Sequence, residues 1–246
     1  AVRRLVEEGH EGDALVFMPG AFEIDRTVDA VRAELRGVAG GASFDVVPLH
    51  GSMPPDRQDA AVAPAARGRR KVIVATNVAE TSITIPGVRM VVDSGLARIF
   101  RVDPRRGLNA LRTEAISRAS ADQRAGRAGR TAPGVCVRLW TDWEHAQRPA
   151  AETPEVRRID LAESMLMVLS MGFGPFERFP WLDPPEADAV ERARGTLVAI
   201  GAVDAGGVLT AHEVSGALGG HHDHVDVGRR GDVAEADVEA VPEEQR

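Results

Sequence analysis

Cysteine is almost absent from this chain of 246 residues, which excludes two ways of stabilising a fold. The single Cys136 can form neither an intramolecular disulfide nor a cysteine metal site. We therefore expect a protein of a reducing compartment such as the cytoplasm. Long apolar runs are also missing, and none approaches the roughly 20 residues needed to span a bilayer. The sequence predicts a soluble protein with no membrane partner.

Lysine is nearly missing too, since 29 of the 30 basic residues are arginines, and positive charge is unevenly placed. The net charge is −7, yet residues 89–138 contain eleven arginines and only four acidic residues. Residues 212–246 contain nine acidic residues and three arginines. The basic middle is the part that could bind phosphates. The acidic end lacks periodicity and large apolar residues, so we expect a disordered tail over 212–246.

The start of the chain, AVRRLVEEGH, has no initiator methionine and reads as the end of a helix already under way. We therefore expect a piece of a longer protein. Two origins of the acidic tail stay open: a shifted reading frame in a GC-rich gene, or a genuine tail that competes with a polyanion for the basic middle. Its four histidines, His212, His221, His222 and His224, lack a packed frame, so we expect no metal site there.

Short apolar runs alternate with helical or loop-like stretches, which is typical of an α/β domain with a parallel sheet. Four runs predict strands at 14–18, 44–49, 71–75 and 88–93, and a fifth is expected at 134–140. Apolar residues at helical spacing predict a helix between the first two strands: Ile24, Val28, Val31 and Leu35. The domain is expected to cover residues 1–150.

Two further units are expected beyond the sheet. Residues 96–117 form two alternating arms around a turn at 103–107, which predicts an inserted β-hairpin. Amphipathic helices at 159–172 and 186–201, followed by a short hairpin at 202–210, indicate a small winged-helix domain over 151–211.

The segment SADQRAGRAGR (120–130) places three arginines three residues apart. Like charges at this spacing repel one another on a helix, and Ser120 with Gln123 fits a capping box at its start. One interpretation is a solvated, arginine-rich surface helix. The other is a site for a polyanion, because a guanidinium group binds phosphate oxygens bidentately.

Four stretches decide between these interpretations by their resemblance to a known family. LVFMPGAFEI (15–24), ATNVAETSITIPGV (75–88), VVDSG (91–95) and QRAGRAGR (123–130) resemble, in this order and spacing, motifs IV, V, Va and VI of the DEAH-box helicases. The similarity is to the bacterial HrpB-like branch and runs from about residue 12 to Thr210. It implies a second RecA-like domain followed by a winged-helix domain of an ATP-dependent RNA helicase.

The resemblance implies an ATP site shared between two domains. Arg127 and Arg130 would reach the γ-phosphate as arginine fingers, and Gln123 would position the attacking water. Ser82 and Thr84 would also lie at the nucleotide. The role of Arg124 stays open between a salt bridge within the domain and a third phosphate contact.

The resemblance also implies an edge that binds single-stranded or partly duplex RNA by its backbone. Its contacts would be Gly20, Gly51, Thr76, Asn77, and Arg105 and Arg106 at the hairpin tip. For Thr76 a cap at the end of a strand is the alternative. The hairpin would act as a wedge that separates a duplex.

Several features of the family are missing. Pro86 and Val62 stand where many relatives have an aspartate for the ribose and an aromatic residue for the base, so other NTPs besides ATP are expected to bind. No G-x-x-x-x-G-K-[ST] loop and no DEAH sequence occurs, so the phosphate cradle and Mg²⁺ would belong to an upstream RecA-like domain of the same protein. This chain alone is then expected to be inactive. A non-catalytic nucleic-acid-binding or regulatory fragment and a DNA-directed helicase are the alternatives.

Overall fold

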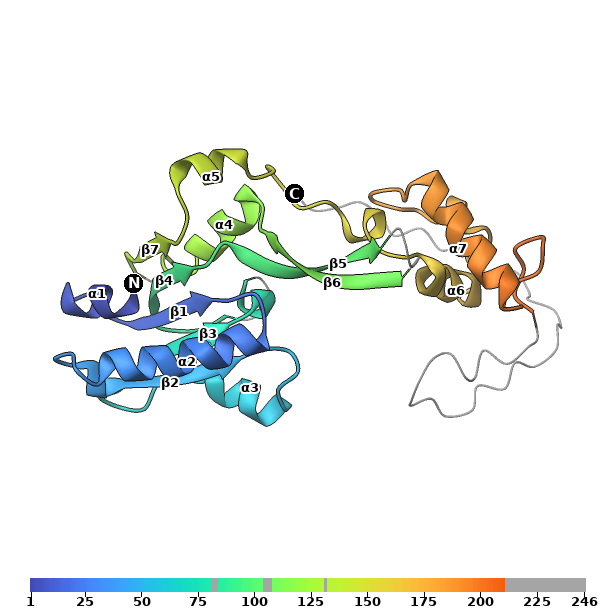
Figure 1. Cartoon of the computed structure of the whole chain (residues 1–246). Helices are drawn as coiled ribbons and strands as arrows, with labels where there is room; N and C mark the ends of the chain where they lie inside the picture. The colour runs from blue at the N-terminus through green and yellow to red at the C-terminus, as the bar shows by residue number, and fades with distance from the viewer. Residues whose placement is uncertain (81–83, 104–107, 131, 211–246) are drawn as a thin grey trace, which may run out of the picture.

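The computed structural model describes residues 1–80, 84–103, 108–130 and 132–210. Figure 1 shows the arrangement of the elements. Along the chain these are α1 (Val2–Glu7), β1 (Asp13–Phe17), α2 (Ala21–Leu35), η1 (Gly41–Ser43), β2 (Phe44–Leu49), α3 (Pro55–Val62), β3 (Arg70–Ala75), η2 (Asn77–Ala79), β4 (Val88–Asp93), β5 (Leu96–Asp103), β6 (Leu108–Ala115), α4 (Arg118–Ala125), β7 (Val135–Arg138), α5 (Asp142–Gln147), η3 (Glu155–Arg157), α6 (Ala162–Ser170), η4 (Phe176–Arg178) and α7 (Ala187–Ala199).

The five-stranded sheet confirms the α/β prediction. Its strand order is β2-β3-β1-β4-β7, and every neighbouring pair is parallel. The first four strands begin and end within one residue of the predicted bounds. The fifth is shorter than predicted, because β7 ends at Arg138 and Leu139 beyond it is half exposed.

Both faces of the sheet are covered, as the alternation of side chains along each strand requires. On one face, Ala14 and Val16 pack with the buried stripe of α2, which consists of the four residues that the helical spacing predicted. On the other face, Leu15 and Phe17 pack with residues of α3 and with Ala128. The sheet is therefore the middle layer of three.

The only lysine of the chain is buried and completes a helix end. Lys71 Nζ donates to the carbonyl oxygens of Ala60, Ala61 and Ala63, at 2.8, 3.2 and 2.6 Å, at the C-terminus of α3. These carbonyls have no partner within the helix, and a cation suits the negative end of the helix dipole. Lys71 thereby fixes α3 to strand β3.

The predicted β-hairpin is confirmed. Strands β5 and β6 pair antiparallel, from Leu96 opposite Ala115 to Asp103 opposite Leu108. The tip at 104–107 lies outside the described residues, and the predicted RNA contacts Arg105 and Arg106 lie there. In Figure 1 the hairpin runs from the sheet toward α6 and α7.

Residues 155–210 form a helical unit with its own core, built from α6, α7 and η4. This unit lies against the hairpin, since Val102 N donates to Arg158 O at 2.9 Å and Asp160 N donates to Asn109 Oδ1 at 2.7 Å. The expected hairpin at 202–210 is a turn closed by one bridge, between Val203 and Leu209. Two strands do not form because Asp204 Oδ1 accepts from Gly206 N and Val208 N and holds the turn tightly.

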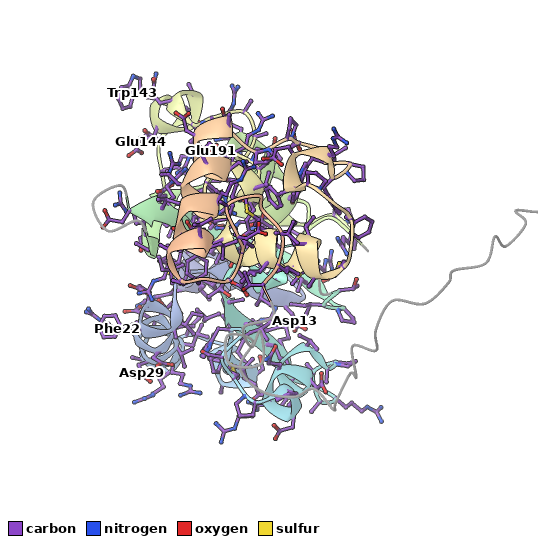
Figure 2. All side chains as sticks on the ribbon, turned by 90° about the vertical axis from the view of Figure 1, so that its right-hand side faces the viewer. Asp13, Phe22, Asp29, Trp143, Glu144 and Glu191 are labelled. Atoms are coloured by element: carbon purple, nitrogen blue, oxygen red, sulfur yellow. The ribbon has the colours of Figure 1, made fainter. Side chains whose placement is uncertain are left out.

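The view along the hairpin separates the two ends of the sheet domain. In Figure 2, Phe22 and Asp29 of α2 lie on the side opposite Trp143 and Glu144 of α5. Phe22 and Trp143 are largely exposed.

Helix α5 begins in a capping box, in which Thr141 Oγ1 accepts from Glu144 N and the Glu144 carboxylate accepts from Thr141 N. The predicted domain boundaries at 150 and 211 stay predictions, and the tail from 212 lies outside the described residues.

The backbone at Gly134 lies so close to the backbone of Ala128 and Arg89 that a side chain at this position would clash. A Cβ there would lie 2.2 Å from Ala128 O and 2.5 Å from Arg89 O. We expect Gly134→Ala to lower the free energy of unfolding by about 1–3 kcal/mol, because the backbone must move to relieve the clash. Urea unfolding of the variant and of the unmodified chain measures this difference in the free energy of unfolding. Gly129→Ala is the control, since a Cβ at Gly129 meets no atom within 4 Å; equal midpoints for the two variants would contradict this close packing.

Candidate functional site

The predicted RNA-binding residues come from the carboxyl ends of three adjacent strands. Gly51 follows β2, Thr76 and Asn77 follow β3, and Gly20 follows β1. Gly51 and Asn77 are exposed, whereas Thr76 is half-buried. Thr76 Oγ1 accepts from Val78 N at 3.5 Å and so caps η2, as the alternative interpretation expected. These four residues form one row along the edge at which open parallel sheets bind ligands.

Helix α4 begins three residues earlier than predicted. Its N-cap is Ser117, whose Oγ accepts from Ser120 N at 3.1 Å. The next two backbone N–H groups donate to distant carbonyls, Arg118 to Pro149 and Ala119 to Ala150, at 2.9 and 3.0 Å. The predicted capping box of Ser120 and Gln123 is therefore wrong, because Ser120 lies inside the helix.

Arg124 is a structural residue and not an exposed phosphate contact. Its side chain is 1% exposed, and it forms ion pairs with Glu80 Oε2 at 2.8 Å and Asp93 Oδ1 at 2.9 Å. It also donates to Leu96 O at 3.2 Å and lies 4.7 Å from the ring centroid of Phe17. The salt-bridge interpretation of Arg124 is confirmed, and the residue joins α4 to the loop after β3 and to the end of β4.

Arg127 follows α4 and lies against the same loop. It is buried, and its Nε donates to Glu80 O at 2.8 Å. The Glu80 carboxylate is held in turn by Ser120 Oγ at 2.7 Å and by Arg124 Nε. Burial, followed by the neighbouring charge of Arg130, lowers the pKa of Arg127. Glu80 thus fixes the loop after β3 to three residues of the arginine segment.

Arg130 is the exposed member of the segment. Its Nη1 donates to Thr84 Oγ1 at 3.2 Å, so two predicted nucleotide-binding residues lie together. Gln123 is exposed on α4, and Ser82 lies outside the described residues. Beyond the C-terminus of α4 the structure therefore presents the exposed guanidinium of Arg130 beside the hydroxyl of Thr84, with the buried guanidinium of Arg127 three residues earlier in the chain.

The described residues offer no metal centre. Within residues 1–80, 84–103, 108–130 and 132–210, no group of three or more His, Cys, Asp or Glu residues could hold a metal ion. The thiol of Cys136 is also unsuited to binding a metal, because burial and then Asp93 raise its pKa to about 11. The arginine segment suits an anion such as a polyphosphate, and not Mg²⁺.

Sequence reasoning missed the residues that hold the hairpin base. Arg148 Nη1 donates to Gly95 O at 2.8 Å and to Ile116 O at 2.9 Å, the residues directly before β5 and directly after β6. Its guanidinium lies 4.3 Å from the ring centroid of Trp140. Gly95 has a positive φ of 72°, so a side chain there would be strained as well as crowded by Trp140. Only the polar strand end Asp93-Ser94-Gly95 was visible as a signal in the sequence.

Comparison with known proteins shows the family to which this chain belongs. Residues 1–132, more than half of the chain, match the model of the helicase conserved C-terminal domain. The chain is 41% identical over 199 residues to the probable ATP-dependent RNA helicase DHX34 of Mus musculus. The chain belongs to the DEAH-box helicases. It is also 38% identical over 209 residues to the ATP-dependent RNA helicase HrpB of Escherichia coli strain K12.

Solved structures agree with this family. The crystal structure of the E. coli DEAH/RHA helicase HrpB matches with a TM-score of 0.76 and 35% identity, over 85% of this chain and 26% of that chain. The matches cover 81% of this chain and 17% of DHX34, and 85% of this chain and 25% of HrpB. This chain thus spans between a sixth and a quarter of the length of these DEAH-box relatives. Among its described helices, none is long and apolar enough to cross a membrane.

Proposed function

We propose that this chain is the C-terminal part of the motor of an ATP-dependent RNA helicase. In this proposal it supplies arginines to an NTP held by a first RecA-like domain and grips the RNA backbone. The observation that carries the proposal is the pair formed by Arg130 and Thr84 beyond the C-terminus of α4, together with Arg127 bonded to Glu80 O.

The chemistry assigned to the arginines is electrostatic. Phosphoryl transfer spreads negative charge over the γ-phosphate oxygens, and a guanidinium aimed at them stabilises the transition state. Arg130 is exposed and already beside a hydroxyl, so it can reach a phosphate from outside the domain. Arg127 would act from a fixed position because its Nε is bonded to a backbone carbonyl. Gln123, exposed one turn before Arg127, would orient the attacking water.

ATP and Mg²⁺ would be held chiefly by the other domain. Mg²⁺ prefers octahedral oxygen ligands from carboxylates, water and phosphates, and the described residues assemble no such cluster. When bound, the ion would neutralise charge on the transferred phosphoryl group. The residues of this chain would bind and orient the γ-phosphate, and Thr84 would add a hydroxyl contact near it.

The row of Gly20, Gly51, Thr76 and Asn77 is assigned to the RNA. Small residues and backbone N–H groups at strand ends suit contact with phosphates and sugars, which position a strand without reading its bases. The hairpin next to this row would separate the duplex. The resemblance to RNA helicases, and not a feature of the site, favours RNA over DNA.

These assignments give a direct test on the purified chain. We expect it to bind single-stranded RNA of different sequences with similar affinity and to hydrolyse no ATP in the presence of Mg²⁺. Affinity should fall steeply with salt, because backbone contacts release counterions. Fluorescence anisotropy with labelled oligo(U) and oligo(A), together with a phosphate-release assay, measures both. Strong preference for one sequence, or magnesium-dependent turnover, would contradict the proposal.

A further inference from the structure

A basic side chain of the hairpin lies directly on the row assigned to RNA. A Cβ placed on Gly20 would be 2.7 Å from both Cζ and Nε of Arg98, so the guanidinium of Arg98 rests on the backbone of Gly20. Arg98 belongs to β5, which begins beyond the carboxyl end of β4. Strand β4 pairs with β1 up to Phe17, three residues before Gly20. The hairpin therefore brings a positive charge to the loop after β1.

Arg98 also lies near Asn77, another residue of the row assigned to RNA. Together with Asn77 it lines a hollow of about 380 Å³ beneath the hairpin, which Phe100 and Arg158 also line. Each of the three acidic residues of this hollow already has a partner. The Glu80 carboxylate accepts from Ser120 and Arg124, and Glu152 Oε1 accepts from Ser117 N at 2.7 Å. Glu155 Oε1 lies 3.9 Å from Arg158 Nη2.

The ion pair that Arg98 makes is weak and open to exchange. Its Nη2 lies 3.5 Å from Glu23 Oε2, and the two side chains are 40% and 35% exposed. Pairs of this kind contribute little to stability in water. Arg101 on the same strand differs, because its Nε contacts both Glu114 oxygens at 2.6 and 2.8 Å. Arg101 is committed to the hairpin, whereas Arg98 can change its partner without loss of the fold.

We propose that Arg98 binds a phosphate group of the RNA backbone at Gly20, in exchange for Glu23. This inference rests on the proposed function and adds a residue to its RNA-binding row. RNA-free protein keeps Arg98 on Glu23. A phosphate that enters beside Gly20 and Asn77 takes the guanidinium as a bidentate donor, and the Glu23 carboxylate, left near the phosphate, opposes binding.

The test compares charge variants of the purified chain in binding labelled single-stranded oligo(U). Arg98→Ala should weaken binding about tenfold at low salt, and should reduce the slope of log K against log salt by about 0.7, the value of one phosphate contact on a single strand. Arg36→Ala is the matched control. It removes the same charge just beyond the C-terminus of α2, at the far end of a 15-residue helix from Gly20.

A second variant changes affinity in the opposite direction. Glu23→Gln should tighten binding two- to threefold, roughly the effect of removing one screened like charge, and general damage to the fold cannot produce a gain. If Arg98→Ala binds as tightly as Arg36→Ala while the unmodified chain binds RNA, Arg98 is no phosphate ligand and the proposed function stands. If the unmodified chain does not bind oligo(U), both the proposed function and the role of Arg98 are contradicted.

Discussion

Arg130→Ala should lower kcat for ATP hydrolysis by about 10³, the lower end of what arginine fingers contribute in other NTPases. The assay uses a chimaera in which this chain replaces the matching part of E. coli HrpB, because the match covers 85% of this chain. The loss is expected in kcat and not in RNA affinity, since Arg130 acts on charge that develops in the transition state. Its exposed side chain makes a folding defect a poor explanation.

Arg127→Ala should show a loss of the same order, with a cost in stability because Arg127 is buried against Glu80. Arg36→Ala in the same chimaera is the control and should hydrolyse ATP at the unmodified rate. Unchanged kcat for both Arg127→Ala and Arg130→Ala would show that neither residue is an arginine finger.

Arg124→Ala should lower the free energy of unfolding by about 3–5 kcal/mol, the cost of removing one partner of a buried ion pair. The reason is that the fully buried Asp93 carboxylate would lose its ion pair and keep the Gly95 N–H at 2.8 Å on Oδ1, while Glu80 would lose its contact with Arg124 Nε. Asp93 Oδ2 has no hydrogen-bond partner among the described residues, so the remaining carboxylate would be poorly compensated. Urea unfolding of the purified chain measures the difference.

The matched control removes a more exposed ion pair, between Asp122 of α4 and Arg138 of β7. Arg138 Nη2 lies 2.6 Å from Asp122 Oδ1, with the two side chains 30% and 69% exposed. Arg138→Ala should cost only about 0–1 kcal/mol. Equal losses for Arg124→Ala and Arg138→Ala would contradict the view that the buried pair joins α4 to the sheet.

The sheet could be predicted from the sequence because local patterns determine it. A strand that is covered on both faces of its sheet needs apolar side chains on both sides. An almost continuous apolar run such as KVIVA (71–75) therefore indicates a buried strand of a parallel sheet. The hairpin was equally visible from its alternating arms and its turn. Residues that end the strands, including Gly20 and Asn77, could be placed at one edge by topology alone.

The buried contacts of the arginine segment could not be predicted because they depend on distant residues. An arginine is expected at the surface. Arg124 is buried because Glu80, in the loop after β3, and Asp93, at the end of β4, both pair with it. The start of α4 was misplaced for a related reason. Its first N–H groups donate to the carbonyl oxygens of Pro149 and Ala150, about thirty residues later in the chain. These distant partners, and not the local Ser-x-x-Gln pattern, determine where the helix begins.

The central claim is that this chain completes an NTP site but does not contain one. Magnesium-dependent, RNA-stimulated ATP hydrolysis tests it in three samples: the purified chain, E. coli HrpB without the matching part, and the chimaera of the two. The account predicts turnover by the chimaera alone. Turnover by the purified chain, or a folded, RNA-binding chimaera without turnover, would contradict it.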